Sequence, residues 1–342
     1  MTRYLMRQCI LLFFTLLALT LFTFCLSYWF TGEAMTNSSG LLPEHPDYAD
    51  TFAARAFDRG VVAQYIAYVQ HLFQGDWGRS LLDGAPVFEQ LKVRFGASFE
   101  VIFLVLLLAW IPGVSLGVLA ALKPGKASDQ LILGCSIAGY SIPVFWLAQL
   151  AILVIAVHLG LTPIAGQINP LYEIPALTGS ILVDITLARP DNLSGAYLSA
   201  LQHMILPILV LAVMPMMLLI RLTRNSMLDV LAKNYIVASY AKGMSTRRVL
   251  WSHAIPNAMQ QVIRQLGSLM SLLIANTLIV EVIFSWPGIG SWLVRSIFER
   301  DYPVIQGGLL IIGMLILVSH VLLNLFHAWR YPQVRKDLYA SS

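Results

Sequence analysis

The chain has 342 residues, of which 58% are hydrophobic and only 12% are charged. A soluble domain carries about 25% charged residues, so this chain could not cover the surface of one. The composition excludes a water-soluble enzyme, a disordered protein and a nucleic-acid-binding protein, despite a net charge of +4. The three cysteines lie inside apolar runs and indicate neither disulfides nor a thiolate metal site. The sequence predicts an all-α, polytopic membrane protein.

Six apolar runs are long enough to cross a bilayer as helices, which takes about 20 residues each. The first follows Arg3 and Arg7, as the apolar part of a signal peptide would, but it is too long for one and no small-residue cleavage site follows it. We expect an uncleaved anchor. The third run contains Pro143 and is either one kinked helix or a re-entrant pair. The six runs are approximately residues 9–30, 99–122, 131–158, 204–222, 266–285 and 307–329.

Basic residues decide the number of spans and their orientation, because cytoplasmic loops carry an excess of Lys and Arg. With six spans and the N-terminus inside, the inner segments hold 14 basic and 3 acidic residues, and the outer segments hold 8 and 13. Splitting the third run would place segment 221–264, with seven basic residues, outside. The sequence therefore predicts six transmembrane helices with both termini in the cytoplasm.

The outer loops contain further helical patterns. Residues 61–73, in the long first loop, have helical spacing and are expected to lie along the membrane surface. In the second loop we expect short helices near residues 171–173 and 182–184.

The chain shows no residue pattern for catalysis or for ATP binding. Its seven histidines form no H-E-x-x-H pair, a G-x-S-x-G elbow is missing, and Gly125 and Lys126 belong to no phosphate-binding loop because Ala127 follows them. We expect no catalytic residue, no metal site and no cofactor. If the protein uses ATP, another subunit binds it.

Two acidic residues fall inside predicted spans, where a charge is costly and usually faces protein or water. Glu100 begins the second span and is expected to be structural. Glu281 lies near the outer end of the fifth span, where a hydrogen bond between helices and a place along a transport pathway are equally consistent. Two isolated acids make a poor proton relay, which disfavours a proton-coupled carrier.

The inner segment 221–264 carries the most specific pattern. Residues 234–242 suit a short helix that Gly243 ends in left-handed geometry. Ser245 is a suitable N-cap for a second helix, which we expect Pro256 to break. Two short helices joined at a glycine form a compact projecting unit. A basic loop held against anionic lipid would not need this punctuation.

This segment resembles the coupling loop, or EAA loop, of permease subunits of binding-protein-dependent ABC importers, in their peptide (oligopeptide and dipeptide) branch. Val-Ala-Ser at 237–239 stands where the family has Glu-Ala-Ala, and Ala-Lys-Gly at 241–243 matches the peptide branch. The resemblance implies that the loop docks into a cleft of the ATPase. The residues that it implies for coupling are Ala238, Ser239, Lys242, Gly243, Arg247, Arg248, His253, Pro256 and Asn257.

The resemblance continues in Ser-Ile-Pro-Val-Phe-Trp at 141–146, Lys-Pro-Gly at 123–125 and Val-Ile-Phe-Ser-Trp-Pro-Gly-Ile-Gly at 282–290. Shorter motifs, such as Phe-Trp-Leu-Ala at 145–148, look most like the Sap-type peptide transport permeases. That group is associated with antimicrobial-peptide resistance and is implicated in putrescine export. The alternative is a general di- or oligopeptide importer permease. Residues 327–330, His-Ala-Trp-Arg, depart from the acidic and D-P-R ending of the branch.

The resemblance implies the type I ABC importer permease fold in the bacterial inner membrane. Residues 1–96 would be an N-terminal anchor with a large periplasmic loop, 97–331 a five-helix core with the coupling loop at about 223–264, and 332–342 a cytoplasmic tail. The implied partners are a second related permease in a heterodimer, two ATPases at the cytoplasmic face and a periplasmic binding protein. The chain would form half of a pathway for peptides or polyamines.

The Pro and the two glycines after the fifth span predict a tight turn that acts as an external gate. The gate and pathway candidates are Pro143, Glu281, Trp286, Pro287, Gly288 and Gly290. Two rivals come from other classes. An intramembrane enzyme would require a catalytic constellation that the sequence does not show, and a membrane scaffold would not need the glycine-punctuated loop.

Overall fold

The computed structural model describes residues 2–331, and within that range the chain is helical with loops and a single isolated bridge, between Arg79 and Pro86. The prediction of an all-α protein is confirmed. The helices are α1 (Thr2–Trp29), α2 (Ala34–Ser39), α3 (Tyr48–Ala54), α4 (Val61–Phe73), α5 (Val87–Leu122), α6 (Ala127–Ser141), α7 (Val144–Ala151), the π-helix η1 (Ile152–His158), the 3-10 helix η2 (Pro170–Tyr172), α8 (Ile181–Ala188), α9 (Leu193–Leu231), α10 (Asn234–Ala241), α11 (Thr246–Val249), the π-helix η3 (Leu250–Ala254), α12 (Ile255–Ile283), α13 (Ile289–Glu299) and α14 (Tyr302–Arg330).

Five helical stretches of the described chain are long and apolar enough to cross a membrane, and a bent pair makes six if it counts as one span. The bent pair is the third apolar run: its two halves meet at 95° around Pro143. The residue before a proline is pushed out of helical geometry, and Ile142 accordingly has extended backbone angles. The bend that the sequence predicts at Pro143 is therefore present, and counting the bent pair as one span gives the predicted six.

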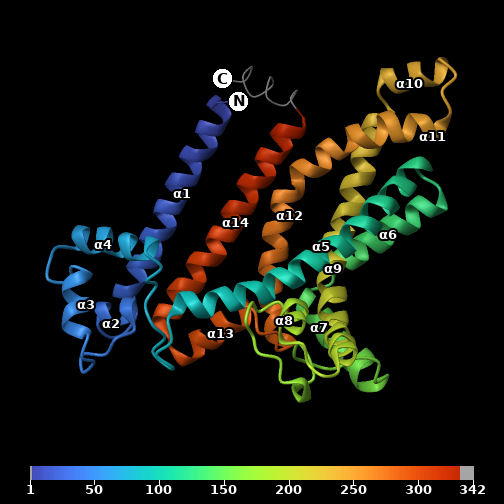
Figure 1. The fold of residues 1–342 in the computed structure, drawn as a ribbon. Helices are drawn as coiled ribbons and strands as arrows, with labels where there is room; N and C mark the ends of the chain where they lie inside the picture. The colour runs from blue at the N-terminus through green and yellow to red at the C-terminus, as the bar shows by residue number, and fades with distance from the viewer. Residues whose placement is uncertain (1, 332–342) are drawn as a thin grey trace.

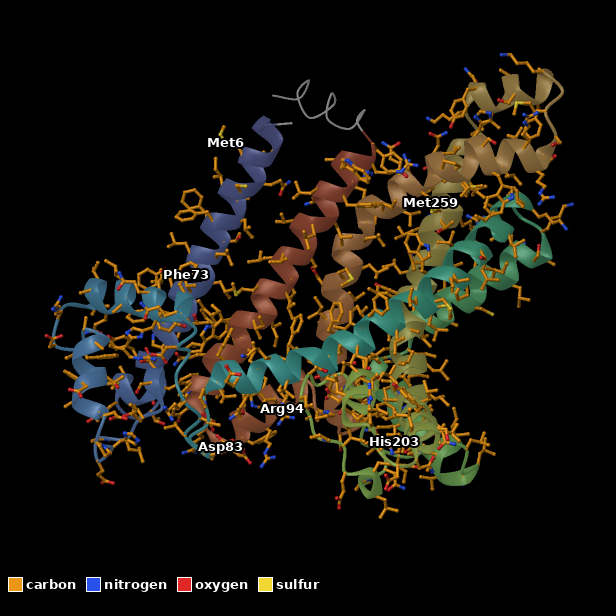
Figure 2. The ribbon with its side chains drawn as sticks, in the orientation of Figure 1. Met6, Phe73, Asp83, Arg94, His203 and Met259 are labelled. Carbon is orange, nitrogen blue, oxygen red and sulfur yellow. The ribbon has the colours of Figure 1, made fainter. Side chains whose placement is uncertain are left out.

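The spans run alternately between two ends of the molecule (Figure 1). The start of α1, the end of α14 and helices α10 and α11 lie at one end, which we call the inner end. Helices α2, α3, α8 and α13 lie at the other, which we call the outer end. Figure 2 shows the same division, with Met6 and Met259 toward the inner end and Asp83, Arg94 and His203 toward the outer end.

Close packing of α5 against α9 forms the centre of the core. Gly113 and Gly117 of α5 face α9 so closely that an added Cβ would lie 2.8 Å from the Leu219 Cβ and 2.6 Å from the Thr223 Cβ. Small residues let membrane helices approach in this way. Helix α12 packs on α9 and α14, and α1 packs on α14.

Helix α4 has the predicted bounds, and it packs on α1 through a hydrogen bond of 2.9 Å between Tyr65 and Thr20. The short helices η2 and α8 confirm the prediction for the second outer loop. Glu100 is buried and accepts hydrogen bonds from the Ser180 hydroxyl and from two backbone N–H groups at the start of α8. Its role in the structure is therefore to hold α8 against α5.

Three details differ from the sequence prediction. Helix α5 begins at Val87, so the expected boundary between residues 96 and 97 falls inside a helix. Pro256 does not break a helix: it lies in the first turn of α12, and residues 246–283 form one continuous helical stretch. Helix α13 was not predicted, although its apolar residues recur at helical spacing. The predicted tail, residues 332–342, lies outside the described residues.

Candidate functional site

The projecting unit of α10, the turn after it and α11 forms the first part of the candidate site. Gly243 follows α10 with a φ of +80°, as predicted for a helix-ending glycine. Its N–H donates to the Tyr240 carbonyl at 2.9 Å, and the Met244 N–H donates to the Ser239 carbonyl at 3.3 Å. An added Cβ at Gly243 would meet nothing within 4 Å. The glycine is therefore required by backbone conformation, and the space around it is open.

The two faces of this unit differ. Ile236, Val249 and Ala254 are buried and pack with residues from α5 and α9. The opposite face exposes Val237 and Trp251, at 61% and 68% of their surface, beside the candidate coupling residues. Exposed apolar side chains grouped with basic ones are typical of a surface that binds a partner. The exposed candidates are Ala238, Lys242, Gly243, Arg247, Arg248, Pro256 and Asn257, while Ser239 and His253 are half-buried.

The passage from α11 into α12 explains why the predicted break is absent. Residues 250–254 form a π-helix, whose wider turn changes the hydrogen-bond pairing. Pro256 follows in the first turn of α12, where its missing N–H is tolerated. The Asn257 side-chain amide donates to the His253 carbonyl at 2.6 Å. Ser245 has the extended backbone of an N-cap, but its side chain makes no capping hydrogen bond, contrary to expectation.

A buried ion pair links this inner region to the spans. Arg224 of α9 donates through Nε and Nη2 to the two oxygens of Asp129 of α6, at 2.6 and 2.7 Å. The Gly125 N–H donates to the same carboxylate at 2.8 Å. This bidentate arrangement fixes the turn between α5 and α6 against α9. No motif in the sequence pairs these distant residues.

The second part of the site is at the outer end, around Glu281. This carboxylate is 1% exposed and accepts from the Ser98 hydroxyl at 2.5 Å and from the Gly290 N–H at 2.6 Å. Trp286 is also buried, and its indole N–H donates to the Ala97 carbonyl at 3.0 Å. The turn that follows α12 is thus held against α5. Of the two roles expected for Glu281, the hydrogen bond between helices is the one that its contact with Ser98 makes.

Glycine is required at positions 288 and 290 because any side chain there would collide with neighbouring atoms. A Cβ at Gly288 would lie 2.2 Å from the Glu281 Oε1, and one at Gly290 would lie 2.4 Å from the Leu278 Cα. The left-handed residue of the turn is Ser285, with a φ of +51°. Pro287 accepts a hydrogen bond of 3.3 Å at its carbonyl from Arg94.

The gate and pathway candidates divide into two groups. Five of them, Glu281 and the four residues from Trp286 to Gly290 named above, lie together at the outer end, in the last turn of α12 and the segment that joins it to α13. Pro143 lies at the bend between α6 and α7, with its side chain exposed. Sequence reasoning missed Ser98 and Arg94, which hold the turn from α5. Only the polar character of these residues within a helical stretch could have drawn attention to them.

A neighbouring carboxylate shows how the outer end is held. Asp301, just before α14, is buried and accepts from the Ser80 hydroxyl and from the Leu81 N–H. Burial raises the pKa of Asp301, and these hydrogen bonds oppose that rise.

Sequence comparison identifies the class of protein to which this membrane-spanning core and projecting inner unit belong. Residues 113–336 match the family described as the inner membrane component of binding-protein-dependent transport systems. The chain belongs to this family of ABC transporter permeases and is a multi-pass inner membrane protein.

Individual relatives are similar over almost the whole chain. The dipeptide transport system permease protein DppB of Escherichia coli K12 is 35% identical over 341 residues, covering 98% of this chain and 99% of the relative. The di/tripeptide transport system permease protein DppB of Pseudomonas aeruginosa is 35% identical, with coverage of 98% and 99%. The putrescine export system permease protein SapB of Escherichia coli K12 is 34% identical, with coverage of 98% of both chains. The resemblance to the peptide branch is confirmed, but these identities do not separate its subgroups.

Proposed function

We propose that the chain forms half of the pathway of an ATP-driven importer of short peptides, paired with a second, related permease. The observation that carries this proposal is the unit of α10, Gly243 and α11. One face of the unit packs on α5 and α9, and its opposite face presents exposed basic and aromatic side chains. A movement of an ATPase bound to this exposed face would therefore be passed to two spans.

The proposed orientation places this unit in the cytoplasm. The start of α1 and the end of α14 lie at the same end as α10 and α11, which agrees with an even number of crossings. The basic residues of segment 221–264 also gather at that end, as cytoplasmic segments do. Two ATPases would bind there, and a periplasmic binding protein would dock at the outer end.

Short peptides are the proposed substrates because two of the relatives named above are dipeptide or di/tripeptide permeases. A Sap-type role, in antimicrobial-peptide handling or putrescine export, is the second candidate. It is favoured by the motifs near residues 145–148 and by the similarity to SapB.

Substrate-dependent ATPase activity of the reconstituted complex tests the proposal. The complex would contain this chain, the second permease, the ATPases and the binding protein, and it would be assayed with dialanine, a cationic peptide, putrescine and haem. We expect stimulation by dialanine. Stimulation by putrescine or the cationic peptide alone would favour the Sap-type candidate. Failure of nucleotide-binding chains to co-purify with this chain would contradict the proposed coupling.

A further inference from the structure

A cavity of about 860 Å³ opens at the outer end, between the N-terminal part of α5 and α13. Its volume is in the range of small-molecule sites, roughly 300–1,000 Å³. The wall includes the turn after α12 on one side and the loop around Asp83 on another. The cavity is therefore next to the fastened outer turn, and the contacts of Arg94 with Pro287 and of Ser80 with Asp301 lie in its wall.

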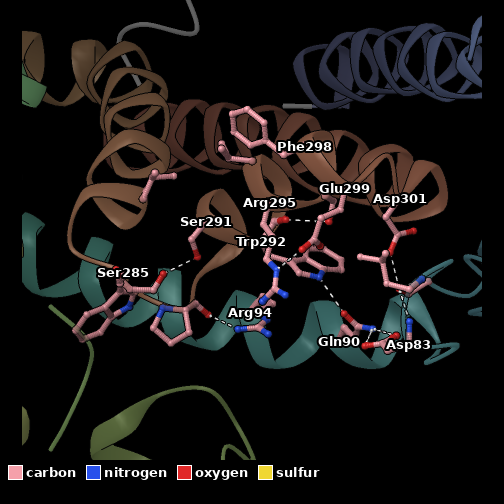
Figure 3. Close-up of a pocket in the computed structure, with 17 residues that line it drawn as sticks. Asp83, Gln90, Arg94, Ser285, Ser291, Trp292, Arg295, Phe298, Glu299 and Asp301 are labelled. Carbon is pink, nitrogen blue, oxygen red and sulfur yellow. Dashed lines mark hydrogen bonds and ion pairs between the residues drawn. The ribbon is translucent and has the colours of Figure 1, made fainter.

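Two guanidinium groups, of Arg94 and Arg295, face this cavity (Figure 3), and they are close enough to interact electrostatically. Arg295 is exposed and pairs with Glu299 at 3.0 Å. Arg94 is half-buried, and its one hydrogen bond to the described chain goes to the Pro287 carbonyl. A guanidinium has five N–H donors, so most of the donors of Arg94 remain available to a ligand.

Two acidic residues of the wall, Asp83 and Asp301, are hydrogen-bonded to groups other than Arg94. Asp301 accepts from Ser80 and Leu81, and Asp83 accepts from the Ala85 N–H at 2.9 Å and from the Gln90 amide at 3.0 Å. Figure 3 shows Asp83 and Asp301 toward one side of the cavity, away from the contact of Arg94 with Pro287. The cavity thus offers the donors of Arg94 beside Pro287 and carboxylates at Asp83, at Asp301 and at Glu299, which is paired with Arg295.

We propose that this cavity binds the two charged ends of a short peptide, with its C-terminal carboxylate on Arg94 and its amino group toward Asp83 and Glu299. The inference rests on the proposed function and specifies its substrate class at the outer end of the pathway. Arginine recognises carboxylates through paired N–H donors. A polyamine has no carboxylate to place on Arg94, so this site distinguishes peptides from putrescine.

The position of the site connects binding to the outer turn. Arg94 donates to the Pro287 carbonyl, and Pro287 lies in the turn that Glu281 and Ser98 fasten. A carboxylate that draws the Arg94 side chain toward the cavity weakens its contact with Pro287. Peptide arrival would in this way loosen one of the contacts that hold the turn closed.

The test compares dialanine with dialanine amide in the reconstituted complex, using the KM of substrate-stimulated ATPase activity. We expect Arg94→Gln to raise the KM for dialanine about tenfold, as loss of a charge-assisted hydrogen-bonded pair would, and to leave the KM for the amide nearly unchanged. Arg94→Lys keeps the positive charge but not the paired N–H donors of the guanidinium group, and it should raise the KM for dialanine by a smaller factor. Lys92→Gln, an exposed change on the same helix outside the cavity, is the matched control.

Three results would overturn the inference. If both Arg94 variants raise the KM for the acid and the amide equally, Arg94 acts by holding Pro287 and binds no carboxylate. If they lower the affinity of the complex for its binding protein and leave the ratio of the two KM values unchanged, the cavity belongs to a docking surface. A wild-type complex that responds to putrescine and to neither form of dialanine overturns the proposed function itself, and this inference with it.

Discussion

The hydroxyl group of Ser98 in α5 donates a hydrogen bond of 2.5 Å to the carboxylate of Glu281 in α12. The same hydroxyl oxygen accepts from the Ile289 N–H at 2.9 Å, and the other carboxylate oxygen accepts from the Gly290 N–H. Two segments far apart in the sequence, α5 at Ser98 and residues 281–290, therefore meet at one buried pair. Because a buried polar group is costly to leave unsatisfied, this pair holds the outer turn in a single position.

Glu281→Gln should loosen the outer turn. A glutamine amide nitrogen cannot accept the hydrogen bond of Ser98 or of Gly290, so one of these donors loses its partner, at a cost of roughly 1–3 kcal/mol. Ile289 is 2% exposed in the closed turn. We expect faster labelling of a cysteine introduced at Ile289 in the nucleotide-free complex.

The control for this change is Glu89→Gln, which alters an exposed carboxylate of α5 that is paired with Lys92. It should leave the labelling rate as it was. Equal labelling of Glu281→Gln and the unsubstituted protein would mean that the charge of Glu281 does not hold the turn. A fall in transport of cationic substrates with unchanged labelling would favour the pathway-lining role instead.

Gly288→Ala should disrupt the same turn by steric collision. The added Cβ would lie 2.2 Å from the Glu281 Oε1 and 2.3 Å from its Cδ, which is closer than any non-bonded contact permits. We expect a lower midpoint of thermal unfolding for the complex in detergent. Gly134→Ala, in α6, is the matched control because its added Cβ meets nothing within 4 Å and alanine favours a helix. The prediction is wrong if the two variants unfold at the same temperature.

The projecting unit could be predicted from short sequence patterns. The contacts around Glu281 at the outer end could be found only from the folded structure. The end of α10 at Gly243 follows from a helix pattern and one glycine. The bond between Glu281 and Ser98 joins residues that no local pattern connects. The start of α5 was missed because a span is recognised by its apolar residues, and this helix continues beyond them through polar ones such as Gln90.

The error at Pro256 has a different origin. Proline normally ends a helix because it lacks an N–H and its ring clashes with the preceding turn. Here a π-helix precedes α12 and Asn257 supplies a side-chain donor to the His253 carbonyl, so the chain stays helical. This accommodation depends on backbone geometry that the residue types alone do not reveal.

Asp129→Ala should weaken the connection between the inner turn and α9. The change leaves the Arg224 guanidinium without the carboxylate that it contacts at 2.6 and 2.7 Å, and it also removes the acceptor of the Gly125 N–H. We expect a loss of roughly 1–3 kcal/mol of stability, since Arg224 keeps partial access to solvent. Thermal unfolding of the complex measures this loss.

A double-mutant cycle measures the interaction energy between Asp129 and Arg224 separately from their other contacts. The combination Asp129→Ala with Arg224→Ala should be less destabilising than the sum of the two single changes, because no charge is then left without its partner. Lys92→Gln, which breaks an exposed pair, should change the unfolding temperature little. Additive effects at Asp129 and Arg224 would show that the contact contributes nothing of its own.

Gly243→Glu should separate the permease from its ATPase while the spans remain inserted. A side chain at a φ of +80° costs about 1–2 kcal/mol, and a glutamate there would project into the open space where we place the ATPase. Gly160→Glu is the matched control: Gly160 also has a positive φ, of +61°, and an added Cβ there meets nothing within 4 Å, but it lies in the second outer loop. We expect loss of ATPase co-purification and of transport for Gly243→Glu only.

Arg247→Gln and Arg248→Gln should each reduce transport less than Gly243→Glu does, because exposed charges contribute mainly long-range attraction. If these arginine changes reduce transport more than Gly243→Glu does, the projecting unit is an electrostatic anchor on lipid and the coupling role is wrong.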